Sequence, residues 1–82
     1  NGSGKKAMRI YKECLVSVKK AETIEEIKAA IETYTNQMNK LKDIETQERD
    51  DIYTALETIM ENTKVEVAYD TWFNWFDNLR DF

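Results

Sequence analysis

The strongest constraint on the fold is a repeat of apolar residues at intervals of three and four along most of the chain. The longest example has six apolar residues separated by 3, 4, 3, 4 and 3 positions: Ile24, Ile27, Ile31, Tyr34, Met38 and Leu41. Because an α-helix turns once in about 3.6 residues, this spacing gathers them on one face. The pattern predicts a long helix with one side buried.

Three further stretches repeat this spacing. Their apolar sides are Met8, Tyr11, Leu15 and Val18; then Ile52, Leu56, Ile59 and Thr63; and finally Val65, Tyr69, Trp72, Phe76 and Leu79. Helices are therefore predicted near 7–20, 24–41, 47–61 and 64–80, with connections of two to five residues. Short connections favour antiparallel neighbours, so the predicted fold is all-α, a small antiparallel four-helix bundle. One bent helix across Asn62 and Thr63 is the alternative, and it would leave three helices.

The predicted helix starts carry capping residues rather than Gly or Pro. Thr23 followed by Glu26 has the spacing of a capping box, in which each side chain bonds the other residue's backbone N–H. Thr63 and Glu66 repeat this spacing, and Thr46 is a predicted cap for the third helix.

A chain of 82 residues is long enough for one small domain. Residues 1–6 are predicted to be a disordered or tag-derived tail, and residues 7–82 a single helical-bundle domain. The one cysteine, Cys14, cannot form an internal disulfide, which favours a reducing, cytoplasmic environment. No apolar run is long enough to predict a membrane span.

The residue types speak against catalysis. There is no histidine, and Cys14 falls on the apolar side of its helix, where an inert buried thiol is predicted. The acidic run DIETQERDD, from Asp43 to Asp51, lacks the central Gly of a calcium loop. We therefore expect no enzyme activity, no catalytic residue, no metal site, no cofactor and no small-molecule ligand.

Charge is unevenly distributed along the chain. Residues 1–20 carry six basic groups and one acidic group, whereas the remaining residues carry six basic and fifteen acidic groups. Five of the basic residues lie opposite the first apolar side, and these are candidate nucleic-acid-binding residues: Lys5, Arg9, Lys12, Lys19 and Lys20. The alternative is that they only offset the charge of neighbouring acidic helices.

Five of the nine aromatic residues lie in the last twelve residues, TWFNWFDNLRDF. Trp72, Phe76 and Leu79 fall on the predicted buried side of the fourth helix. Phe73 and Trp75 fall on its two flanks, where a small bundle covers them only in part. With Phe82, they are candidate partner-binding residues; packing at the rim of the core is the alternative.

The run AYDTWFNWFDNLRDF (Ala68–Phe82), the capped helices and the basic first helix resemble a small phage family. Its members are encoded beside the UvsW recombination helicase of T4-like phages. The family is similar to the helicase-and-RNase-D C-terminal module, a helical bundle that binds structured nucleic acid. Those modules usually have Gly-containing turns, whereas this chain has no Gly after Gly4, and no residue role is carried over from them.

Together these features predict a non-enzymatic accessory module linked to phage DNA recombination or repair, located in the host cytoplasm. The first expected partner is structured or single-stranded nucleic acid, bound weakly through the first helix. The alternative is a protein-protein adaptor or homodimer that uses the aromatic fourth helix, with a helicase or other recombination protein as partner.

Overall fold

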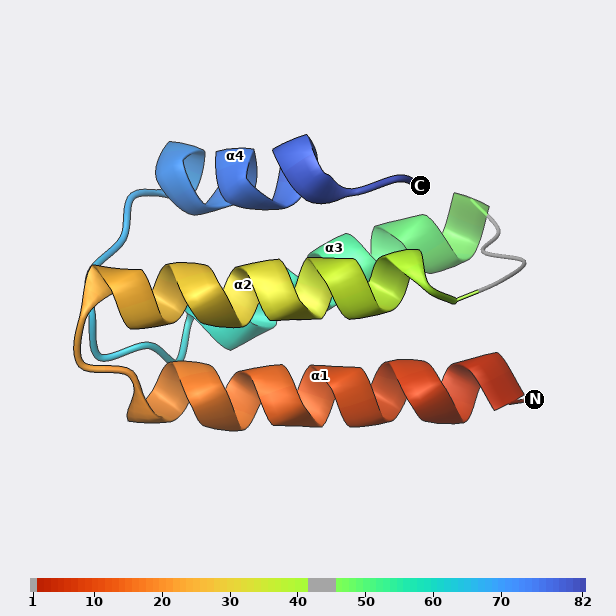
Figure 1. Cartoon of the computed structure of the whole chain (residues 1–82), viewed down its shortest axis with the longest axis horizontal. Helices are drawn as coiled ribbons and strands as arrows, with labels where there is room; N and C mark the ends of the chain where they lie inside the picture. Colours follow the sequence, from red (N-terminus) through yellow and green to blue (C-terminus); the bar gives the residue numbers. More distant parts are fainter. Residues whose placement is uncertain (1, 42–45) are drawn as a thin grey trace.

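The computed structural model describes residues 2–41 and 46–82, and the side chains of residues 5–41 and 48–82. It contains four helices: α1 (Gly2–Lys20), α2 (Ile24–Asn39), α3 (Thr46–Met60) and α4 (Tyr69–Leu79). Successive helices run in opposite directions along the long axis of the molecule (Figure 1). The predicted small all-α bundle is therefore confirmed, and α3 and α4 are separate helices.

The helix α2 occupies the centre of the bundle. It packs against α1 on one side and α4 on the other, while α1 also packs against α3. Figure 1 shows α1 and α4 on opposite sides of α2, with α3 behind it. The molecule measures 34 × 21 × 17 Å. This arrangement leaves the outer surface of α1 far from α4.

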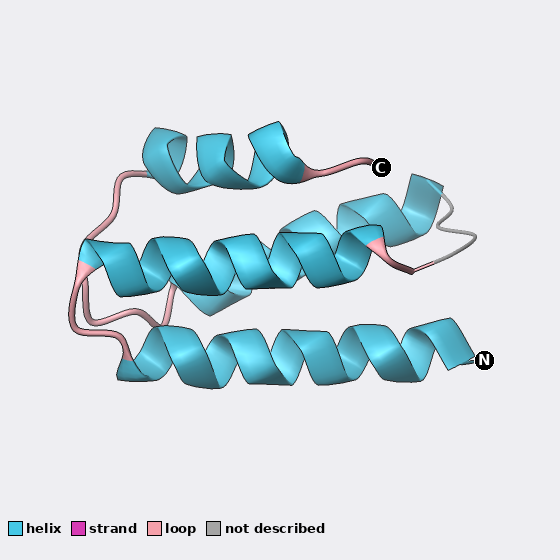
Figure 2. Ribbon diagram, viewed as in Figure 1, coloured by secondary structure: helices cyan, strands magenta, loops and turns pink. Residues whose placement is uncertain are grey.

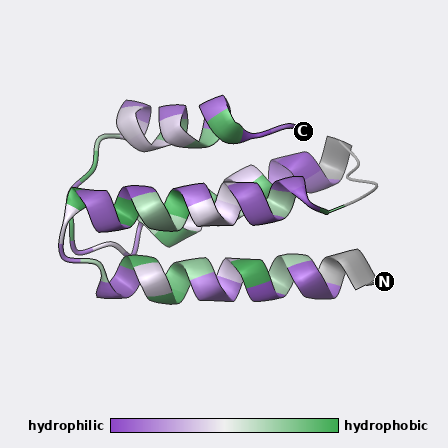
Figure 3. Cartoon of the chain, in the orientation of Figure 1, coloured by the Kyte–Doolittle hydropathy of each residue, from purple (hydrophilic) through white to green (hydrophobic). Residues whose placement is uncertain are grey.

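The core draws on all four helices. The largest fully buried side chains include Tyr34 from α2, Leu56 from α3 and Phe76 from α4. The Tyr34 hydroxyl donates a hydrogen bond of 2.7 Å to the backbone oxygen of Ile52, which joins α2 to α3. Within residues 5–41 and 48–82, no buried side-chain nitrogen or oxygen lacks a hydrogen-bond partner. Figure 3 shows apolar and polar residues alternating along the helices, as amphipathic helices require.

The buried side of α1 differs from the prediction. Its buried residues are Ile10, Cys14 and Val18, and the buried Ala21 follows directly after the helix, while Tyr11 and Leu15 are half-buried and Met8 is 53% exposed. The small side chains allow α1 to lie close to α2, and the Cys14 sulfur is 3.7 Å from the backbone oxygen of Ala30. The row that contains Cys14 is therefore buried in place of the row that contains Tyr11 and Leu15, because its smaller side chains permit closer packing. On α2, likewise, the first helical residue Ile24 is exposed.

The capping box at the start of α2 is confirmed. The backbone N–H of Glu26 donates to the Thr23 hydroxyl at 3.2 Å, and the Glu26 carboxylate accepts the N–H of Thr23 at 3.1 Å. It also accepts the N–H of Glu22 at 2.9 Å. The bond from the Glu22 backbone, with those from Thr23, lowers the pKa of Glu26. Thr46 is the first residue of α3, and its side chain lies outside the described ranges.

The predicted capping box at Thr63 and Glu66 is wrong. The helix expected from residue 64 begins at Tyr69, after an eight-residue connection over 61–68 (Figure 2). The Thr63 hydroxyl accepts the N–H of Val65 at 3.0 Å and closes a local turn. Val65 and Val67 are half-buried while Lys64 and Glu66 are exposed, the alternation of an extended segment. Two β-branched residues in such alternation favour extended backbone over helix.

The other helix boundaries lie close to the predicted ones, except at the start of the chain. There α1 begins at Gly2 and includes residues 2–6, for which the sequence predicts a disordered or tag-derived tail. Ala7 is half-buried against the core, so the helix has a packing contact within its second turn.

Candidate nucleic-acid interface and aromatic edge

The five candidate nucleic-acid-binding residues lie on one exposed face of α1, the basic face: Lys5, Arg9, Lys12, Lys19 and Lys20. Their spacing along the helix places them opposite the buried row that contains Cys14 and Val18. Val16 lies among them and is 49% exposed. Because α1 packs on α2 and α3 through its other side, the basic face is turned outward as a unit.

No cation of the basic face forms an ion pair with a described carboxylate. In the part of the chain with described side chains, one ion pair occurs, between Arg80 and Asp77 at 2.8 Å. It lies at the end of α4, away from α1. Glu13 is the one acidic residue within α1, and it too is exposed. A row of unpaired cations on a rigid helix is suited to contacting a phosphate backbone.

The three candidate partner-binding residues are all half-buried, but they do not form one surface. Phe73 stacks on Tyr69, with ring centres 5.7 Å apart, and meets the ring of Tyr53 edge-on at 5.7 Å. Trp75 lies on the opposite flank, where the Lys28 ammonium of α2 is 5.9 Å from its ring centre. Phe82 contacts the buried Phe76 at 5.8 Å. The predicted partial cover of the two flanks is confirmed.

The sequence did not indicate how exposed Tyr69 is. The apolar repeat predicts Tyr69 on the buried side of the fourth helix, but its side chain is 48% exposed. Because α4 begins at Tyr69, no preceding helical turn covers the ring. Its hydroxyl forms a short hydrogen bond with that of Tyr53, and this bond raises the pKa of Tyr53. On the same helix Trp72 and Phe76 are buried as predicted, while Leu79 is half-buried.

The end of the chain is held by one side chain of α2. The Asn39 amide donates to the backbone oxygen of Leu79 at 2.8 Å, and its oxygen accepts the N–H of Asp81 at 2.9 Å. These two bonds span about forty positions of sequence and fix the segment that carries Phe82 against the bundle. A single polar residue on a helix gave no sequence signal of this role.

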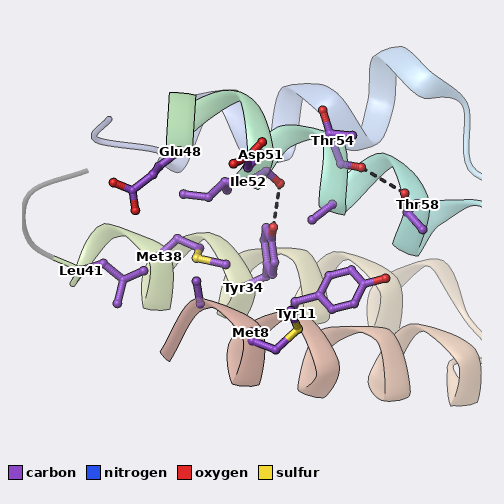
Figure 4. A pocket seen from close by; sticks show the side chains of 12 residues that line it. Met8, Tyr11, Tyr34, Met38, Leu41, Glu48, Asp51, Ile52, Thr54 and Thr58 are labelled. Atoms are coloured by element: carbon purple, nitrogen blue, oxygen red, sulfur yellow. Dashed lines mark hydrogen bonds between the residues drawn. The ribbon is translucent and has the colours of Figure 1, made fainter. Parts of the chain in front are cut away.

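A groove of about 460 Å³ opens between α1, α2 and α3. Figure 4 shows Tyr34 and Met38 at its floor, Met8 and Tyr11 on the α1 side, and Ile52 on the α3 side. Its charged lining residues are Glu48 and Asp51. Because no Lys or Arg is among the described lining residues, the described part of the groove does not continue the basic face.

The chain's one thiol lies in the core. Cys14 is buried, as predicted, and burial raises its pKa to about 12, so the thiol is protonated near neutral pH. Across the described residues, no three His, Cys, Asp or Glu side chains gather into a group that could hold a metal ion.

No helix in the described part of the chain has the length and apolar character needed to cross a membrane. Comparison of the chain with family models, with curated proteins and with solved structures gives no match.

Proposed function

We propose that this chain is a non-enzymatic accessory module that binds nucleic acid weakly through the basic face of α1. The observation that carries the proposal is the set of five exposed cationic side chains on one helix face, none paired with a carboxylate among the described side chains. Contacts from such side chains go to phosphates, so binding depends on shape and charge rather than base sequence.

The acidic character of the whole chain limits the affinity. The formal net charge is −4, so long-range repulsion opposes the local attraction of α1. We therefore expect modest affinity that falls steeply with salt. A role in phage DNA recombination or repair is proposed from the resemblance over Ala68–Phe82 and from the bundle design.

A chemical-shift titration of the labelled chain with branched, duplex and single-stranded DNA at low salt tests this proposal. The expected shifts map to exposed positions of α1, and the double variant K12E/K19E weakens binding for every DNA sequence. The control R49E/K64E changes the net charge equally, at exposed positions outside α1. Equal weakening by both variants, or shifts confined to α4, would contradict the proposal.

A second candidate function, a protein-protein adaptor or homodimer, is favoured by one observation on α4. The exposed Tyr69 ring stacks on the half-buried Phe73, which leaves an aromatic surface at the start of that helix. Trp75 and Phe82 are half-buried beside Lys28 and Phe76, whereas Phe73 is half-buried beside the exposed Tyr69, so Phe73 is the candidate that adjoins this surface. Sedimentation of the chain and of Phe73→Ser tests this function: a dimer lost in the variant supports it, and a monomer at all concentrations removes the homodimer.

A further inference from the structure

The exposed side chains of the basic face contain no aromatic ring. Besides the five cations, the exposed positions of α1 within residues 5–20 are Lys6, Met8, Glu13, Val16 and Ser17. Proteins that bind single strands without sequence preference stack the bases on aromatic side chains beside a positive groove. The one aromatic residue of α1, Tyr11, is half-buried and lines the groove between the helices. A strand lying on the basic face therefore finds cations but no stacking surface.

The accessible rings lie elsewhere. Tyr53, Tyr69 and Phe73 belong to α3 and α4, and Figure 1 shows α4 on the far side of α2 from α1. Two carboxylates lie near these rings: Glu57 raises the pKa of Tyr53 after the larger effects of Tyr69 and of burial, and the exposed Asp70 follows Tyr69 in the sequence. Negative charge there repels phosphates. The cations of α1 and the rings of α4 therefore do not form one continuous binding surface.

The shape of the basic face favours a stiff partner. From Lys5 to Lys20 the helix is about 22 Å long, at about 1.5 Å per residue, and its cations follow one straight outer side. A duplex presents a fixed array with one negative charge for about every 1.7 Å of its axis. A single strand has a lower charge density and would lose conformational freedom to align with the same row.

From these three observations we infer that the basic face of α1 binds the phosphate backbone of duplex DNA in preference to single strands. This inference rests on the proposed function and specifies duplex DNA as the preferred nucleic-acid ligand. Each cation that replaces a condensed counterion contributes about −0.9 to the slope of log K against log salt on duplex DNA and about −0.7 on single strands. With five contacts, the slopes approach about −4.5 and −3.5.

The experiment measures fluorescence anisotropy of a labelled duplex and of its separated strand, each titrated with the full chain over a range of salt. Because the two slopes differ by about one, the ratio of duplex affinity to single-strand affinity should rise about tenfold when the salt concentration falls from 1 M to 0.1 M. We expect the wild type and Tyr69→Ser to show the same preference for duplex over single-stranded DNA. We expect weaker binding of both ligands in K12E/K19E.

The outcomes separate the inference from the function on which it rests. Strand binding as tight as duplex binding, or strand binding lost in Tyr69→Ser, overturns the duplex preference and leaves nucleic-acid binding in place. No binding of either ligand, or binding that K12E/K19E leaves unchanged, overturns both.

Discussion

Two tryptophans three residues apart occupy different environments on α4. Trp72 is 5% exposed and packs against Tyr69 and Tyr53, with ring centres 5.0 and 6.4 Å away. Trp75 is half-buried on the α2 flank beneath Lys28. The apolar repeat anticipated this difference, because Trp72 falls on the buried side and Trp75 falls beside it. The contact with Lys28 was not predictable, since it depends on how α4 is rotated against α2.

Truncation of the two indoles should therefore have unequal effects. Trp72→Ala leaves a cavity in the core and is expected to cost about 3–5 kcal/mol of unfolding free energy. Trp75→Ala is expected to cost about 1–2 kcal/mol, because part of that ring already contacts water. Circular dichroism melts measure both losses, and iodide should quench the Trp75 indole more than the Trp72 indole. Equal destabilisation with both indoles shielded would show that the whole segment is core.

The capping box at Thr23 makes part of the stability depend on pH. Backbone hydrogen bonds lower the pKa of Glu26 in the folded chain below its unfolded value. A lowered carboxyl pKa stabilises the fold fully above the unfolded value of about 4.3, and this contribution disappears as the pH falls through the folded value. Glu26→Gln should therefore lower Tm at pH 7 but change it little at pH 2.

A matched pair of threonines separates this cap from general helix propensity. Thr23→Ala is expected to cost about 1 kcal/mol, the usual loss for removing a capping hydroxyl. Thr33→Ala, at an exposed site within α2, should be neutral or slightly stabilising, since Ala is the better helix former. Equal melting temperatures for Thr23→Ala and the wild type would show that the cap contributes nothing.

At the scale of helices, apolar periodicity was sufficient to predict four elements, but it misplaced two features. It predicted helix through 64–68, where the chain forms a non-helical connection in which Val65 and Val67 are half-buried and Lys64 and Glu66 are exposed. It also predicted Met8, rather than Ile10, on the buried side of α1. Both rows have helical spacing, and the choice between them depends on how closely α2 approaches.

The contact between α2 and the end of α4 is the clearest feature that periodicity could not predict. Asn39→Ala removes both hydrogen bonds, one to the last residue of α4 and one to the segment that follows it. At about 0.5–1.5 kcal/mol for each bond, we expect a loss of about 1–3 kcal/mol and faster amide exchange over residues 79–82. Asn36→Ala, at an exposed position of the same helix, is the control. Unchanged exchange in Asn39→Ala would mean that Phe82 alone holds the segment.

At the scale of the whole molecule, the structure separates the basic face of α1 from the aromatic residues of α4. The five cations of the basic face lie on the outer side of α1, and Figure 1 shows α4 on the far side of α2. The sequence predicted that the five basic residues share an exposed face, because charge and periodicity are local properties. It could not predict that they lack carboxylate partners among the described residues, since that depends on the packing of neighbouring helices.

The most direct test of the central claim is the salt dependence of duplex DNA binding by the wild type and by K12E/K19E. If the basic face contacts phosphates, the wild-type slope of log K against log salt approaches about −4.5, and the double variant loses about two contacts and about 1.8 from the magnitude of the slope. The charge-matched control R49E/K64E should keep the wild-type slope. A slope that is the same in all three proteins would contradict the account, because Lys12 and Lys19, at the centre and towards the end of the basic face, would then make no phosphate contact.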